Sequence, residues 1–275
     1  MDPNPEDSIK SFTKYTDPSE ASRIYFLPNL FTAGNLFFGF LAIIRCIQAK
    51  YDPNPAISKE FYTHAVWLIL LACICDALDG RMARIGRQES IFGKEFDSIA
   101  DVVSFGVAPA LMVFFLILSP TDGYPFFRQV GWFIGFIYLL CAGVRLARFN
   151  VLTSPLLVGD KDDVKCGDFS GLPVPAAAGV IASLVLVLNR FDLHTWTLAL
   201  PGLMLLIAWL MTSNIPYPSF KNINWHTRTP LKTFIGIVLL GVLILLLKEI
   251  SFSIVFLGYV FYGLIRFARR RTKAN

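Results

Sequence analysis

The chain has 275 residues, of which 55% are hydrophobic and only 16% are charged. A soluble domain carries about 25% charged residues, so this composition indicates an integral membrane protein with little room for a separate soluble domain. The net charge of +5 is modest and the five cysteines fall mostly in or beside apolar segments, so the sequence predicts no nucleic-acid partner, disulfide framework or zinc site.

Apolar segments recur along the whole chain. A membrane-spanning helix needs roughly 20 mostly apolar residues, and the sequence contains eight candidates. They are residues 25–47, 61–80, 97–119, 129–149, 173–190, 195–213, 231–248 and 250–267. The expected fold is therefore all-α, a bundle of about eight transmembrane helices whose last two form a tight hairpin.

Three regions follow from this pattern. Residues 1–22 form a polar tail with neither a basic n-region nor an early apolar core, so no cleavable signal peptide is predicted. Residues 23–213 form the membrane core, and residues 214–275 form a C-terminal hairpin with a basic tail. Within this last region, Ile215 to Lys221 is expected to be a proline-broken segment whose aromatic side chains lie at the membrane interface.

Lysine and arginine are unevenly distributed about these helices. If the amino terminus is cytoplasmic, 19 of the 25 Lys and Arg residues fall on cytoplasmic segments. The positive-inside rule then places both termini in the cytoplasm. The run Arg269-Arg270-Arg271 either lies against anionic headgroups or only fixes the topology.

The first expected helix carries a polar stripe. Asn29, Thr32 and Asn35 are spaced by three and share one face of an otherwise apolar helix. Polar groups at this depth are costly unless they find partners. The residues alone leave two interpretations open: hydrogen bonds to a neighbouring helix, with Gly34 and Gly39 allowing close packing, or a role in lining an active site.

Four aspartates flank the junction between the second and third expected helices. Asp76 and Asp79 (i, i+3) share one face, and Asp97 and Asp101 (i, i+4) share another. Two facing helices would bring four carboxylates together, and because unpaired anions repel, a cation should lie between them. Oxygen ligands without His or Cys suit Mg²⁺, Mn²⁺ or Ca²⁺. One aspartate alone could be a helix cap, but two spaced pairs are not explained by capping.

Residues 76–101 read D-x-x-D-G-x-x-A-R-x₈-G-x-x-x-D-x-x-x-D, and the two glycines remove side chains where a ligand or backbone must come close. This pattern resembles, with no position missing, the signature of the CDP-alcohol phosphotransferases, membrane enzymes of phospholipid synthesis. The resemblance implies two divalent ions, Mg²⁺ or Mn²⁺, bound by Asp76, Asp79, Asp97 and Asp101. It also implies that Asp101 is the general base for the incoming hydroxyl. The positions implied to accommodate the CDP group are Gly80, Ala83, Arg84 and Gly93.

The fourth expected helix ends in R-L-A-R-F-N, residues 145–150. Arg145 and Arg148 (i, i+3) lie on one face at the cytoplasmic rim. They are either a snorkelling pair or guanidinium groups that bind a carboxylate or phosphate.

The segment F-S-G-L-P-V-P-A-A-A-G, residues 169–179, has prolines suited to a first helical turn and small residues suited to close packing. Together with R-L-A-R-F-N and with P-N-x-x-T-x-x-N-L in the first helix, it resembles the phosphatidylserine synthase branch of the family. That branch transfers the phosphatidyl group of CDP-diacylglycerol to L-serine and releases CMP, within a membrane-embedded homodimer surrounded by lipid. The implied acceptor or phosphate-binding residues are Asn29, Thr32, Asn35, Arg145, Arg148 and Asn150.

Two other functions stay open from the sequence. A sister enzyme would use another alcohol, such as glycerol 3-phosphate or inositol phosphate, and would need a denser cationic pocket. A cation-coupled transporter would explain intramembrane acids, but the four aspartates lie near helix ends and no inverted repeat is visible.

Overall fold

The structure is a computed structural model. It describes residues 26–86, 91–118, 125–152, 169–193, 198–217 and 249–274. The first helices are α3 (Phe26–Tyr51), α4 (Pro55–Gly86), α5 (Ile91–Asp101) and α6 (Ala108–Val113). Two π-helical segments, η1 (Val102–Val107) and η2 (Phe114–Leu118), follow α5 and α6. The remaining elements are α7 (Pro125–Leu152), β1 (Phe169–Ser170), α8 (Val174–Arg190), α9 (Ala199–Thr212), β2 (Pro216–Tyr217) and α11 (Glu249–Ala274).

Five of the described helical stretches are long and apolar enough to cross a membrane. They are Asn29–Tyr51, Pro55–Met82, Phe92–Ile117, Val130–Leu152 and Ile250–Arg269. The apolar helices α8 and α9 are shorter, with 17 and 14 residues. Large side chains such as Trp132 and Trp209, each 61% exposed, lie on the outer surface, as expected where lipid replaces water. The predicted all-α membrane fold is confirmed, and the predicted helix 231–248 lies outside the described residues.

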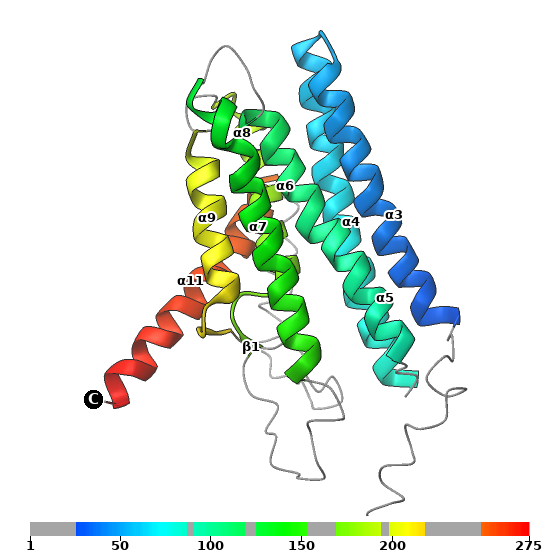
Figure 1. The fold of residues 1–275 in the computed structure, drawn as a ribbon, viewed down its shortest axis with the longest axis vertical. Helices are drawn as coiled ribbons and strands as arrows, with labels where there is room; N and C mark the ends of the chain where they lie inside the picture. Colours follow the sequence, from blue (N-terminus) through cyan, green and yellow to red (C-terminus); the bar gives the residue numbers. More distant parts are fainter. Residues whose placement is uncertain are drawn as a thin grey trace, which may run out of the picture.

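The helices form two groups, with the continuous helical stretch from α5 through η1 and α6 to η2 between them (Figure 1). The antiparallel pair α3 and α4 packs along its length on one side, and α7 packs along α9 on the other. Helix α8 lies between α4 and α11, and α11 leads away from the bundle towards the carboxyl terminus. The start of α3, the start of α5 and the end of α7 lie at the same end of the bundle (Figure 1), and the end of α4, antiparallel to α3, lies there too.

Small residues bring these helices close together. A Cβ atom on Gly39 of α3 would lie 2.6 Å from Cα of Ser104 in η1, and a Cβ on Gly179 of α8 would collide with the Phe256 ring of α11. Close backbone approach at small residues is how helices associate where no water drives them together. The close packing predicted at Gly39 is confirmed, whereas a Cβ on Gly34 would make only ordinary contact.

The third predicted helix begins earlier than expected and is not regular. It starts at Ile91 rather than residue 97, and its helical turns widen into η1 directly after Asp101. The hydroxyl of Tyr138 in α7 donates to the backbone carbonyl of Phe105 at 3.0 Å, inside this π-helical segment. Such segments are frequent at functional sites.

Two short strands were not predicted. Phe169 pairs with Tyr217 and Ser170 with Pro216 in an antiparallel ladder, which ties the start of α8 to the end of α9. Tyr217 is completely buried, and its ring lies tilted by 33° against the Tyr259 ring of α11, with 5.6 Å between the ring centroids. The prediction that this segment presents aromatic side chains to the membrane interface is therefore wrong for Tyr217.

Candidate active site

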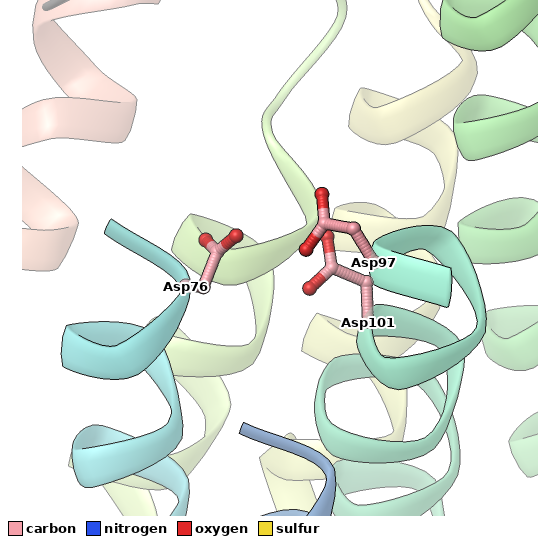
Figure 2. Close-up of side chains that lie close together, drawn as sticks. All are labelled: Asp76, Asp97 and Asp101. Atoms are coloured by element: carbon pink, nitrogen blue, oxygen red, sulfur yellow. The ribbon is translucent and has the colours of Figure 1, made fainter. Parts of the chain in front are cut away.

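Three of the four predicted aspartates converge. Asp76 projects from α4, and Asp97 and Asp101 project from α5 towards it (Figure 2). One carboxylate oxygen from each residue lies within 4.8 Å of the others. The i, i+4 spacing places both α5 carboxylates on one face, and contacts of α3 with α4 and α5 hold the two acid-bearing helices together.

The fourth aspartate is held by α3. Asp79 is only 4% exposed, and its Oδ2 atom accepts a hydrogen bond of 2.9 Å from the hydroxyl of Thr32. Asp79 is not among the three residues whose oxygens converge, but it lies close enough to Asp76 and Asp97 to act on them electrostatically.

The polar stripe of α3 faces the acids. The side-chain amide of Asn35 donates to Oδ1 of Asp101 at 3.0 Å, and the backbone carbonyl of Asn35 accepts a hydrogen bond of 2.9 Å from Ser104 in η1. Asn29 lies one turn before Thr32, and its buried amide nitrogen has no partner among the described residues. The hydrogen bonds to neighbouring helices that the first interpretation expects are therefore present, with Asp79 and Asp101 as their acceptors, and a role in lining an active site stays a prediction.

The donor chemistry of the cluster fits a divalent cation. Its three ligand groups are carboxylates, which Mg²⁺ and Mn²⁺ prefer. Asp101 is 6% exposed, and Oδ1 of Asp97 is buried with no hydrogen-bond partner among the described residues. Three anions this close repel one another, and a bound cation offsets that repulsion.

The predicted CDP-binding positions lie on the helical ends beside the acids. Helix α4 continues to Gly86, so Gly80, Ala83 and Arg84 belong to its last turns, and Gly93 belongs to the first turn of α5. The side chains of Ala83 and Arg84 are outside the described part of the structure.

The two predicted arginines have different environments. Arg145 is 9% exposed, lies with its guanidinium 5.7 Å from the Phe149 ring, and interacts electrostatically with Asp101 and Asp76. Arg148 is exposed and donates to Oδ1 of Asn214 at 2.9 Å. The structure therefore brings Arg145 into the surroundings of the carboxylates, and it places Arg148 at an exposed position with Asn214 as a partner.

Asn150 faces α5. Its amide donates to the hydroxyl of Ser98 at 2.8 Å, and its backbone carbonyl accepts from Lys94 Nζ at 3.2 Å. Sequence reasoning missed Ser98, Lys94 and Ser104. The i, i+4 spacing of Lys94 and Ser98, parallel to that of the acids, is a signal that marks a second polar stripe on α5.

A family model described as CDP-alcohol phosphatidyltransferase matches residues 25–213, which run from α3 to the end of α9. The chain belongs to this family. The resemblance found in the acidic motif is thereby confirmed, and α11 lies beyond the part that the family model matches.

Similar proteins within the CDP-alcohol phosphatidyltransferase family carry more specific names. A CDP-diacylglycerol–serine O-phosphatidyltransferase of Helicobacter pylori (strain J99) is 37% identical over 247 residues, covering 88% of this chain and 91% of the relative. An archaetidylserine synthase of Methanothermobacter thermautotrophicus is 34% identical over 203 residues, 73% of each chain. A CDP-diacylglycerol–serine O-phosphatidyltransferase of Saccharomyces cerevisiae is 33% identical over 188 residues, covering 68% of this chain and 63% of the relative.

Proposed function

We propose that this chain is a CDP-diacylglycerol–serine O-phosphatidyltransferase, which produces phosphatidylserine and CMP. The observation that carries the reaction class is the convergence of Asp76, Asp97 and Asp101 within 4.8 Å at the position of the family motif. The choice of serine is supported by the name of the Helicobacter relative, whose match covers 88% of this chain.

The carboxylates hold two divalent ions, Mg²⁺ or Mn²⁺, in this proposal. Asp76, Asp97 and Asp101 are the ligands, and Asp79, fixed by Thr32, completes the set. The ions would neutralise the pyrophosphate of the donor and stabilise the charge that develops on the departing CMP.

Asp101 accepts the proton of the serine hydroxyl. A hydroxyl is a weak nucleophile until a base takes its proton, and Asn35 fixes one oxygen of this carboxylate by its hydrogen bond. The serine oxygen then bonds to the phosphorus that carries the diacylglycerol, and the bond from that phosphorus to the bridging oxygen of CMP breaks.

The remaining residues bind and orient the substrates. Gly80, Ala83, Arg84 and Gly93 accommodate the CDP group beside the acids. Buried Arg145 receives the serine carboxylate or a donor phosphate, because a guanidinium can hold either with two hydrogen bonds. The amide of Asn29, buried and without a partner among the described residues, is a further donor on the same face. Arg148, which donates one guanidinium N–H to Asn214, is the second arginine proposed to contact the acceptor or a phosphate.

The active site and both termini lie on the cytoplasmic side in this proposal, which the distribution of Lys and Arg supports. Thiol labelling of a single cysteine introduced near Lys273, in sealed right-side-out vesicles, tests the orientation; labelling from outside would contradict it. A homodimer follows from the family resemblance, and the mass of the purified protein in detergent tests it.

The experiment that tests the proposed reaction is CMP release by the purified protein from CDP-diacylglycerol with Mg²⁺ or Mn²⁺. Serine, glycerol 3-phosphate, inositol and inositol phosphate are compared as acceptors. Release with serine alone supports the proposal. Release with a different acceptor would retain the family reaction and overturn the serine assignment. A folded protein that releases no CMP with any acceptor would overturn the reaction itself.

A further inference from the structure

A closed ring of hydrogen bonds joins α5 to the last turn of α7. Lys94 Nζ donates to the backbone carbonyl of Asn150 at 3.2 Å, the Asn150 amide donates to Ser98 Oγ at 2.8 Å, and Ser98 Oγ donates to the backbone carbonyl of Lys94 at 2.9 Å. All three bonds are partly buried. Each of the three residues therefore both donates and accepts within the ring.

The ring lies at the carboxyl-terminal end of α7. Asn150 is two residues before Leu152, where α7 ends, and its carbonyl accepts the hydrogen bond of the Lys94 ammonium. A lysine ammonium at this end also offsets the negative end of the helix dipole. These two effects favour a defined position of α7 against α5.

The ring lies beside the metal carboxylates. Ser98 directly follows Asp97 and precedes Asp101 by three residues, so any rotation of α5 about its axis moves Ser98 and both acids together. A carboxylate about 6 Å from a helix axis moves about 1 Å when the helix turns by 10°. Metal ligands must hold their positions to a few tenths of an ångström, so a rotation of this size weakens binding.

We propose that Asn150 is a positioning residue for the metal site: through Ser98 it fixes the rotation of α5 and so places Asp97 and Asp101 opposite Asp76. On the other flank of α5, the bond from Asn35 to Asp101 holds the same helix against α3. The inference rests on the proposed function, because it requires a divalent ion at these carboxylates. It assigns Asn150 a role through α5, in place of the direct contact with acceptor or phosphate that its motif suggested.

The test measures Mn²⁺ binding to the full-length protein in detergent, by the electron paramagnetic resonance signal of free Mn²⁺, without substrate. Ser98→Ala and Asn150→Ala should each raise the dissociation constant about fivefold, the factor that one ordinary hydrogen bond represents. The double variant should raise the dissociation constant no more than either single substitution, because each substitution removes the same hydrogen bond. Ser98→Thr keeps the hydroxyl and should bind Mn²⁺ like the wild type.

Thr63→Ala is the matched control. The Thr63 hydroxyl donates at 2.9 Å to the carbonyl four residues earlier, as Ser98 does, but it lies on α4 towards the start at Pro55 and makes no hydrogen bond to α5 in the described part of the chain. Thermal unfolding of every variant accompanies the binding measurement. A variant that lowers the melting temperature as Thr63→Ala does, with Mn²⁺ affinity within twofold of wild type, would show a merely structural role.

The outcomes separate the inference from the function beneath it. If the wild type binds Mn²⁺ and Asp76→Asn does not, the metal site is supported. If the wild type does not bind Mn²⁺, both the metal site and the inference are overturned. If the wild type binds Mn²⁺ and both Ser98→Ala and Asn150→Ala bind it equally well, the inference alone fails. If Asn150→Ala is unstable, the comparison of Ser98→Ala with Ser98→Thr decides in its place. A raised KM for serine in Asn150→Ala but not in Ser98→Ala would return Asn150 to acceptor binding.

Discussion

The side-chain amide of Asn35 donates a hydrogen bond of 3.0 Å to Oδ1 of Asp101, across the interface between α3 and α5. The bond occupies one oxygen of this buried carboxylate and leaves the other for a metal ion or an incoming hydroxyl. Thr32, one turn earlier on α3, makes the corresponding bond to Asp79. Residues of the first helix are therefore expected to influence the reaction through the acids that they orient.

Replacing Thr32 by valine tests this indirect role, because valine keeps the shape of threonine and removes only the hydroxyl. The buried Asp79 carboxylate would lose its hydrogen bond from α3, and we expect the Mn²⁺ concentration for half-maximal activity to rise about 10- to 100-fold, as for other residues that orient metal ligands. Thr32→Ser, which keeps the hydroxyl, should lie within a few-fold of wild type. Equal metal dependence in the valine and serine variants would contradict the role.

Asp101→Asn tests the general base. The amide keeps the size of the side chain but cannot accept the serine proton, so turnover should fall by at least about 100-fold. Donor binding, measured with radiolabelled CDP-diacylglycerol, should change far less, and the melting temperature should stay close to that of wild type. A variant that retains full turnover would remove Asp101 from this role.

Asp76→Asn tests the metal site from the other helix. Asp76 is the carboxylate that α4 contributes to the three-carboxylate cluster found among the described residues, so loss of this proposed ligand should abolish activity and Mn²⁺ binding together. Removing metal from the wild type with EDTA should abolish activity in the same way, and added Mg²⁺ or Mn²⁺ should restore it. Chelation that leaves CMP release unchanged would show that no divalent ion takes part.

The features that sequence predicted well depend on local geometry. The position of each described spanning helix follows from its apolar run, and the facing of Asp97 and Asp101 follows from four-residue spacing along one helix. Lengths were less accurate at the polar ends: α4 continues to Gly86 and α5 begins at Ile91, because charged helical turns can extend beyond an apolar core.

The features that sequence missed depend on partners far along the chain. Asn150 donates a hydrogen bond to Ser98, 52 residues away in the sequence, and neither residue alone predicts this pairing. Tyr217 is buried because Gly263 of α11 leaves room for its ring, where a Cβ atom would collide with it. An aromatic residue between prolines looks equally suited to a membrane interface, so only tertiary packing decides its place.

Arg145→Ala and Arg148→Ala separate the two arginines of the motif. Arg145 is buried beside Asp101, whereas Arg148 is exposed and paired with Asn214, so the Arg145 variant should lose more activity. If Arg145 holds the serine carboxylate, its loss should raise the KM for serine by more than about tenfold, the effect of a lost charged hydrogen bond. A raised KM for the donor alone would place Arg145 at the pyrophosphate. A larger loss in Arg148→Ala would contradict the assignment.

Gly171→Ala tests the junction between the strands and α8. Gly171 has φ of 85°, which L-residues rarely adopt, and its N–H donates to the carbonyl of Ile215 at 3.0 Å. An added Cβ would also collide with the carbonyl of Met211, so the substitution combines backbone strain with a steric clash. We expect the free energy of unfolding to fall by about 1–3 kcal/mol, seen as a lower melting temperature in detergent.

Gly202→Ala on α9 is the control, because a Cβ there meets nothing within 4 Å and alanine favours the helix by up to about 1 kcal/mol. Since β1 and β2 tie the start of α8 to the end of α9, the strained variant should also lose activity at temperatures where Gly202→Ala remains active. Equal melting temperatures for the two variants would show that the junction tolerates a side chain and does not depend on glycine.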